Sequence, residues 1–127
     1  MGLYLRLPVT LVLHSVLCAE NLKKETKLIL FNTTFHLDST IESDFLAWIR
    51  ESFIPAALSA GIKKPLLCRI VDNIEPGCSA FALQAFIGSV DEADKWRSEY
   101  LCKLLAEMSV RWKDRALAFS TPMEVLE

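Results

Sequence analysis

The sequence predicts an α+β domain in which one antiparallel four-stranded sheet carries two helices on one face. Two observations predict this class. Four segments have the apolar alternation or the apolar runs of β-strands, and two longer segments repeat apolar residues at helical spacing. Their order is β-α-β-β-α-β, the order of split βαβ or ferredoxin-like sandwiches. With 127 residues, 52% of them hydrophobic, the chain suffices for one such domain.

The first 26 residues stand apart from this pattern. Arg6 precedes the mostly apolar segment 7–19, which has the length of a signal-peptide core but is shorter than the roughly 20 residues of a membrane span. Bulky Leu17 fits poorly before a signal cleavage site. We expect an N-terminal extension at 1–26, either a signal peptide or a start assigned too far upstream, and a domain at 27–127. No membrane span is expected, and the expected location is cytoplasmic, with export as the alternative.

The first half of the domain predicts a strand followed by a helix. Residues 28–37 open with apolar residues and continue with β-branched and aromatic ones, which favours a strand. Asp38 and the two hydroxyl residues after it offer N-cap side chains, and apolar residues then recur at helical spacing through Arg50. Pro55 is acceptable only in a first helical turn, so a kinked or restarted helical turn is expected to run on to Gly61.

The middle of the domain predicts an antiparallel hairpin. Residues 64–74 read as the second strand and residues 79–87 as the third. The sequence Glu-Pro-Gly at 75–77 is a turn signal between them. Because the connection is short, antiparallel pairing of the two strands is expected.

The last part predicts a long helix and a fourth strand. Ser89 and Glu92 resemble a capping box, and the residues after them form an apolar stripe at helical spacing that includes Trp96. Residues 115–121 then read as the fourth strand, and Pro122 is expected to end it.

A polar stripe on the strands predicts the candidate site. Alternate residues of a strand face opposite sides of the sheet, so the polar residues of the first strand share one side and its aromatic residues the other. Our hypothesis is that six polar side chains converge on the sheet face opposite the helices, and they form the candidate pocket: Asn32, Thr34, His36, Arg69, Gln84 and Ser120.

Each of these residues also has an ordinary structural interpretation. Arg69 is expected to pair with a carboxylate, such as Asp72 or one from a partner subunit, in preference to binding an anion. The amide and hydroxyl groups could satisfy one another across the sheet. His36 is more often a hydrogen-bonded or solvent-facing side chain than a proton-transfer group, and Trp48 and Trp96 are expected in the core.

Charge and cysteine content exclude several function classes. The net charge of −2 and the absence of long basic runs argue against nucleic-acid binding. The four cysteines include no closely spaced pair, so neither a metal site nor a cofactor is expected, and the thiols are interpreted as small apolar side chains, with Cys78 the most exposed. No glycine-rich nucleotide motif or nucleophile elbow is present.

Several separated blocks resemble a known family in the right order. They are NTTFHLD, FLAWIRESFIPAALSAG, LLCRIVD, ALQAF and RALAFSTPMEVL. Residues 28–127 thereby resemble the small bacterial family described only as domain of unknown function 4286. The resemblance implies the dimeric α+β barrel form of the ferredoxin-like fold, in which two sheets face each other, and no established activity. Members start at or next to the first strand, so the extension at 1–26 departs from the family pattern.

Two functional interpretations stay open at this point. The first is an uncharacterised homodimeric binding or interaction module, whose partner is a second copy of itself and whose inter-sheet interior could hold a small organic ligand. The alternative is a cofactor-independent enzyme of the small monooxygenase-like barrel type. In that case His36 would be the acid or base, and Arg69 or Gln84 would orient the substrate. The two differ in whether His36 and Arg69 lie on the same face.

Overall fold

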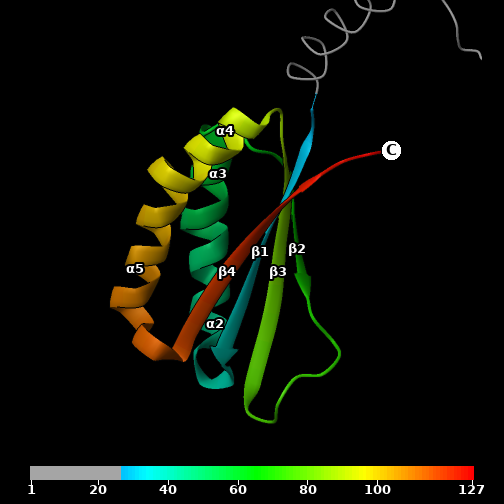
Figure 1. The fold of residues 1–127 in the computed structure, drawn as a ribbon. Helices are drawn as coiled ribbons and strands as arrows, with labels where there is room; N and C mark the ends of the chain where they lie inside the picture. The colour runs from blue at the N-terminus through cyan, green and yellow to red at the C-terminus, as the bar shows by residue number, and fades with distance from the viewer. Residues whose placement is uncertain (1–26) are drawn as a thin grey trace, which may run out of the picture.

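The computed structural model describes residues 27–127, and the extension at 1–26 lies outside the described part of the chain. The described residues form one sheet covered on one side by two helical arms, in the predicted order (Figure 1). The strands are β1 (Ile29–Asp38), β2 (Lys63–Arg69), β3 (Cys78–Ile87) and β4 (Ala116–Glu124). Their order across the sheet is β2-β3-β1-β4, and every neighbouring pair is antiparallel. This is the ferredoxin-like α+β arrangement.

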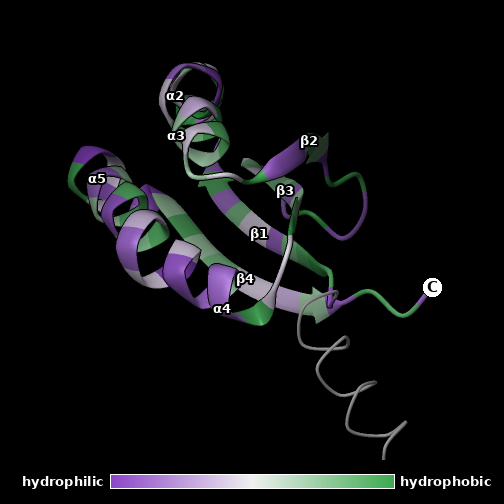
Figure 2. Ribbon diagram, turned by 90° about the horizontal axis from the view of Figure 1, so that it is seen from above, coloured by the Kyte–Doolittle hydropathy of each residue, from purple (hydrophilic) through white to green (hydrophobic). Residues whose placement is uncertain are grey.

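Each helical arm consists of two α-helical parts joined by a π-helical segment. The first arm contains α2 (Glu42–Trp48) and α3 (Ile54–Ser59), and the second contains α4 (Val90–Lys95) and α5 (Cys102–Trp112). Both arms lie on the same side of the sheet (Figure 2). No helix within residues 27–127 is long and apolar enough to cross a membrane.

Local chemistry explains where these arms begin and bend. Asp38 accepts a hydrogen bond from the backbone N–H of Thr40 at the start of the first arm, and Ser89 accepts one from the N–H of Glu92 at the start of the second. In the first arm, the N–H of Ile54 bonds to the carbonyl of Ile49 in π geometry, just before Pro55, which has no N–H of its own. The predicted restart of the helix at this proline is therefore a change of hydrogen-bond register inside a continuous arm.

The core lies between the arms and the inward face of the sheet. Every second residue of β1 from Ile29 to Leu37 is buried, and alternating hydropathy bands follow that strand in Figure 2. Aromatic rings from three elements meet there, with Phe35 in edge contact with Phe45 at 5.1 Å and with Phe53 at 5.7 Å between ring centroids. The predicted core positions of Trp48 and Trp96 are confirmed, since both are buried.

Three details of the sequence interpretation are wrong. The second strand ends at Arg69, because the chain turns away to reach Asn73, whose φ of 57° is a turn conformation. Pro122 does not end the last strand but lies within β4, opposite Phe31; β4 is an edge strand, where proline is tolerated if its nitrogen faces away from the neighbouring strand.

The interpretation of the thiols as small buried apolar side chains is also wrong. Within residues 27–127 all the cysteines are exposed, so they do not serve as small buried apolar residues. Cys68 lies on an edge strand and Cys102 on the outward side of the second arm, which accounts for their exposure.

The turn between α5 and β4 contains a strained residue. Lys113 has φ 53° and ψ −130°, a conformation that favours glycine. The substitution Lys113→Gly is expected to raise the free energy of unfolding by about 1 kcal/mol, because relief of strain exceeds the entropy lost on folding glycine. Chemical denaturation at fixed protein concentration measures this. The matched variant Lys103→Gly, inside α5, should instead lower stability by about 1 kcal/mol. Destabilisation by both variants would contradict the assignment of strain to Lys113.

Candidate functional site

Four of the six predicted site residues lie on the sheet face that the helices leave uncovered, which we call the open face. Residues directly opposite one another in an antiparallel pair share a face. Asn32 lies opposite Gln84, and the next two residues of the stripe, Thr34 and His36, lie opposite small alanines of β3. The odd-numbered residues of β1 from Ile29 to Leu37 are buried under the helices, so the even-numbered residues Asn32, Thr34 and His36 face away from the helices.

Ser120 is not part of this set. It lies opposite Thr33, which is buried on the helix-covered side of β1. The register of β4 therefore places Thr121, together with Phe119, on the open face. The prediction for Ser120 had the alternation of this strand reversed.

Arg69 also lies on the other face. It is opposite Phe81, a core residue, and its guanidinium carbon lies 4.8 Å from the centroid of the Phe81 ring. Its partner is Glu42 at the start of α2, which accepts from Nη2 at 2.7 Å and from Nη1 at 3.2 Å. Arg69 was expected to pair with a carboxylate, and it does, but the carboxylate comes from a helix of its own chain.

This ion pair ties the edge strand β2 to the first helical arm. Ser79 donates a hydrogen bond of 2.6 Å to Oε1 of Glu42, and its hydroxyl also lies 3.0 Å from that of Ser39. The hydrogen bonds from Arg69 and then from Ser79 lower the pKa of Glu42 to about 2. We call Arg69, Glu42 and Ser79 the clamp. These residues hold the fold together, and they are not available for ligand chemistry on the open face.

The clamp predicts an acid-dependent loss of stability. Because the pKa of Glu42 is lower in the folded state, its carboxylate stabilises the fold above pH 4.5, and this contribution is lost as the pH falls from 4.5 towards about 2. In the variant Glu42→Gln this titration is absent. The difference in unfolding free energy between wild type and variant should therefore be constant above pH 4.5 and shrink below it. The control is Glu51→Gln, the same substitution at an exposed carboxylate of the same arm that takes no part in the clamp. A Glu42→Gln profile parallel to that of wild type would contradict the clamp.

The open face is apolar at its sides and neutral in its central rows. Four large apolar side chains on it are exposed, namely Leu66 (59%), Leu117 (59%), Phe119 (56%) and Met123 (39%). Among the strand residues that pair in the described sheet, the charged ones aligned with this face are Asp38 and Lys63, and they lie at its opposite ends. Leu117 and Phe119 are neighbours on one edge strand and Leu66 lies on the other, so large apolar side chains flank the polar middle of this face.

Polar groups occupy the middle of the same face. Nδ2 of Asn32 donates to Oγ1 of Thr34 at 3.0 Å, which confirms part of the predicted mutual satisfaction. Oδ1 of Asn32 is buried and has no hydrogen-bond partner. His36 is exposed, and its ring stacks on Phe119 with 5.8 Å between centroids.

A recess of about 560 Å³ adjoins His36 at the end of the sheet. Three segments come together there, because the end of β1, the β2–β3 loop and the α5–β4 turn all lie at the same end of the sheet (Figure 1). Its lining combines carboxylates, one guanidinium, one thiol and apolar side chains: His36, Leu37, Asp38, Asn73, Ile74, Glu75, Cys78, Asp114, Arg115 and Leu117.

The recess does not contain a prepared acid–base pair. Asp38 accepts hydrogen bonds from the backbone N–H and from the hydroxyl of Thr40, and these bonds, with a smaller effect of the Arg115 charge, hold the pKa of its carboxyl below the ordinary value. Both bonds are accepted by Oδ1, so this oxygen is engaged at the helix start. Within residues 27–127, His36 forms no hydrogen bond or ion pair with a carboxylate, and no three His, Cys, Asp or Glu side chains are grouped as a metal site.

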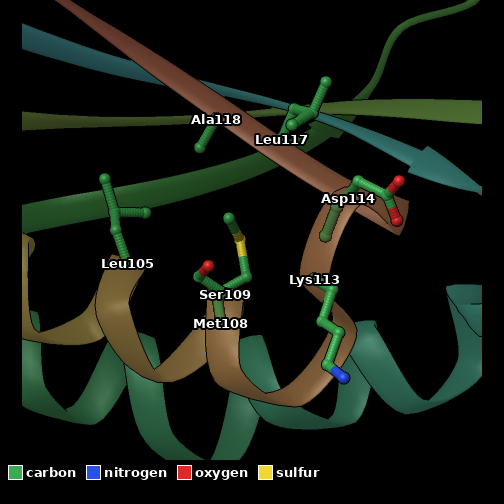
Figure 3. Close-up of a pocket in the computed structure, with 8 residues that line it drawn as sticks. Leu105, Met108, Ser109, Lys113, Asp114, Leu117 and Ala118 are labelled. Atoms are coloured by element: carbon green, nitrogen blue, oxygen red, sulfur yellow. The ribbon is translucent and has the colours of Figure 1, made fainter.

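A second hollow, of about 450 Å³, runs between α5 and the outer edge of β4. Figure 3 shows Ala118 directed from the strand towards Leu105 and Met108 of the helix, with Lys113 and Asp114 at one end. Its walls are mainly apolar. This groove results from incomplete cover of the edge strand, and it brings together no convergent set of reactive groups.

The comparisons identify the family. The model for the domain of unknown function 4286 matches residues 28–126. The chain belongs to this family. No curated protein matches the sequence of this DUF4286 member.

One solved structure supports the fold of this DUF4286 protein, and a second has a lower similarity. A crystal structure of a dimeric ferredoxin-like protein from an uncultured marine organism is 12% identical, with a TM-score of 0.60, and the alignment covers 80% of this chain and 97% of the other. A PII-like signaling protein from Thermus thermophilus is 15% identical, with a TM-score of 0.45 and coverage of 80% and 92%. At these identities the likeness to the marine protein shows the fold alone.

Sequence reasoning missed most residues around His36. Asp38, Glu75 and Arg115 come from three separate connections, and no local motif links them. The signal that could have found them is topological. In the predicted strand order, the end of the first strand, the hairpin turn and the start of the last strand must lie at the same end of the sheet.

Proposed function

We propose that this DUF4286 protein is a homodimeric binding module, in which the open faces of two copies pack together and enclose a small organic molecule. The observation that carries the proposal is the open face itself. It exposes more than half of Leu66, Leu117 and Phe119, whereas the opposite face of the sheet packs against the helices in the buried core. Covering such a face with a second copy removes apolar surface from water without any further element.

The charge of the face supports a second copy as the occupant. Two identical surfaces repel one another when they carry a net charge in the region of contact. The central rows of the open face are neutral, and the two aligned charges, Asp38 and Lys63, lie at its ends and have opposite sign. The marine ferredoxin-like protein of similar fold is described as dimeric, which agrees with this arrangement.

The side-chain sizes favour an enclosed ligand space. Ala80 and Ala82 lie opposite His36 and Thr34, so the side chains of β3 in the middle of the face are small. The larger side chains of Phe119 and Leu66 project from the two edge strands. Two such faces would meet at their sides and leave a central space lined by Asn32, Thr34, His36 and Gln84. Since the amide and hydroxyl groups among them carry no charge, the space suits an uncharged molecule with hydrogen-bonding groups.

No observation favours the enzymatic alternative. His36 and Arg69 lie on opposite faces of the sheet, and the guanidinium is held by Glu42. Gln84 lies opposite Asn32, four residues from His36 along β1, which corresponds to about 13 Å. Within one subunit neither residue can act with His36 on one small substrate.

Native mass spectrometry of the full chain, purified without denaturation, tests the proposal. The expected spectrum contains a species of twice the chain mass, and a fraction of it carries the extra mass of a retained small molecule. The variant Ala82→Phe, which fills the middle of the open face, should lose the retained mass. A dimer that carries no extra mass, and that takes up none after incubation with an extract of cellular small molecules, would reduce the proposal to an interaction module. A monomer would end it.

A further inference from the structure

The two edges of the sheet differ in how they are protected against pairing with a further strand. Strand β2 forms one edge, and it begins with Lys63, Lys64 and Pro65, with a bulge between Lys63 and Leu66. Charged side chains, proline and bulges are the devices with which natural sheets block an edge. At the other edge, residues 116–121 of β4 (ALAFST) contain no charged residue, glycine or proline, and all of them pair in regular register with β1. The edge at β4 is therefore open to the addition of a strand.

Backbone groups of β4 point outward along this edge. In an antiparallel pair, alternate residues bond to the neighbouring strand, and the residues between them direct their N–H and C=O groups away from it. The N–H of Val125, just past β4, bonds to the carbonyl of Leu28 at 2.9 Å, so the odd-numbered residues of β4 bond to β1. The N–H groups of Ala118 and Ser120 consequently point outward, and no strand within residues 27–127 lies beyond them.

The groove of about 450 Å³ lies along the same edge. Leu105 and Met108 of α5 form one wall, and the small side chains of Ala116 and Ala118 form the other (Figure 3). A strand added beside β4 would lie about 4.8 Å from it and would direct every second side chain into this groove. The edge thus combines outward-pointing backbone groups with an apolar channel for alternate side chains, the two features by which sheets bind an additional strand.

We propose that residues 9–13 of the N-terminal extension, VTLVL, add as a strand to this edge of the same chain. Val9, Leu11 and Leu13 would share the side that faces the groove, and Thr10 and Val12 the other side. Neither this segment nor residues 116–121 carry a charge, so their pairing buries no unpaired ion. This surface is separate from the open face, and the inference does not depend on the proposed dimer.

The chain enters the domain close enough to this edge. Lys27, the first described residue, pairs with Glu124 at the end of β4, with 3.3 Å between Nζ and Oε1. From Glu124, Ser120 lies about 13 Å back along β4, and the outer side of β4 lies two strand spacings, about 10 Å, from β1. Residues 14–26 can span about 40 Å when extended, so they are long enough to connect the added strand to β1.

Amide hydrogen exchange of the full chain, resolved by residue with NMR, tests the proposal. After correction for intrinsic rates, the amides of Ala118 and Ser120 are expected to exchange about a hundredfold more slowly than the amide of Leu67. Leu67 is the matched reference at the blocked edge. The N–H of Ile70 bonds to the carbonyl of Ala80 on β3, so the register of β2 directs the N–H of Leu67 outward.

Two neighbouring substitutions in the extension identify the added strand. Leu11→Glu places a charge in the apolar groove, and it should return the exchange rates of Ala118 and Ser120 to that of Leu67. Thr10→Glu introduces the same charge on the side that faces away from the groove, and it should leave the protection in place. Both positions precede residues 27–127, and unchanged exchange of the buried amides of β1 would show that the domain remains folded.

Rapid exchange at Ala118 and Ser120 in the wild-type full chain would overturn the addition of a strand. Protection that persists in Leu11→Glu would overturn the choice of the extension and assign the edge to a strand from another molecule. A chain that shows the expected protection but is monomeric would support this inference and overturn the proposed function alone.

Discussion

Replacing Phe35 with alanine should lower the free energy of unfolding by about 3–5 kcal/mol. Phe35 lies on the central strand β1 and is fully buried, and its ring contacts the rings of Phe45 and Phe53 from the first helical arm. Truncation removes the apolar ring and leaves a cavity between sheet and helices, which rigid aromatic neighbours fill poorly. Thermal unfolding at fixed protein concentration should show a midpoint lower by more than about 10 °C.

A surface truncation provides the control for this effect. Leu58 is 52% exposed on α3, so Leu58→Ala should change the free energy of unfolding by no more than about 0.5 kcal/mol. If Phe35→Ala is too unstable to purify, Phe35→Leu should show a smaller loss in the same direction. Equal stability of the Phe35 and Leu58 variants would show that the aromatic cluster is not the core of the domain.

The second large effect is expected for Phe119→Glu. Phe119 is 56% exposed, stacks on His36 and lies on the open face, so the proposed dimer buries it twice. The substitution replaces an aromatic anchor by a charge that the neutral face cannot pair, in both copies at once. Dimer dissociation should become easier by on the order of a hundredfold or more, measured by sedimentation equilibrium.

Val110→Glu is the matched control for the introduced charge. Val110 is 80% exposed on α5, away from the open face, so the same substitution there should leave dimer dissociation unchanged. Circular dichroism should show that both variants remain folded, because neither position belongs to the core of one subunit. Equal dissociation constants for wild type and Phe119→Glu would place the subunit contact elsewhere.

The architecture could be predicted because local signals agreed with one another. The alternation of β1, the N-cap at Asp38 and the capping serine at Ser89 each fix an element without reference to the rest of the chain. The central part of the candidate site was predictable for the same reason. Asn32, Thr34 and His36 belong to one strand, and Gln84 lies opposite the first of them.

The sequence could not fix which side of an edge strand faces the helices. In β4 the bulky residues Leu117 and Phe119 alternate with Ala116 and Ala118, and the bulky side is the one that is usually buried by its own domain. Here the alanines face the helices and the bulky residues face outward. Ser120 was misplaced in consequence. The reversal has a physical reason if the outward side is buried by a second copy.

Arg69 was misplaced because its partner is distant in sequence. Charged residues inside strands usually face solvent, but Glu42, 27 residues earlier, draws this guanidinium to the helix-covered side. Residue types alone contain no signal for that pairing. The recess beside His36 was missed for a similar reason, since its walls come from connections that only the folded topology brings together.

Sedimentation velocity of the wild-type full chain at micromolar concentration tests the central claim most directly. The packing of two open faces predicts a single species with twice the mass of one chain. A monomer at every concentration up to the limit of solubility would contradict the account, since the apolar face would then be exposed to water.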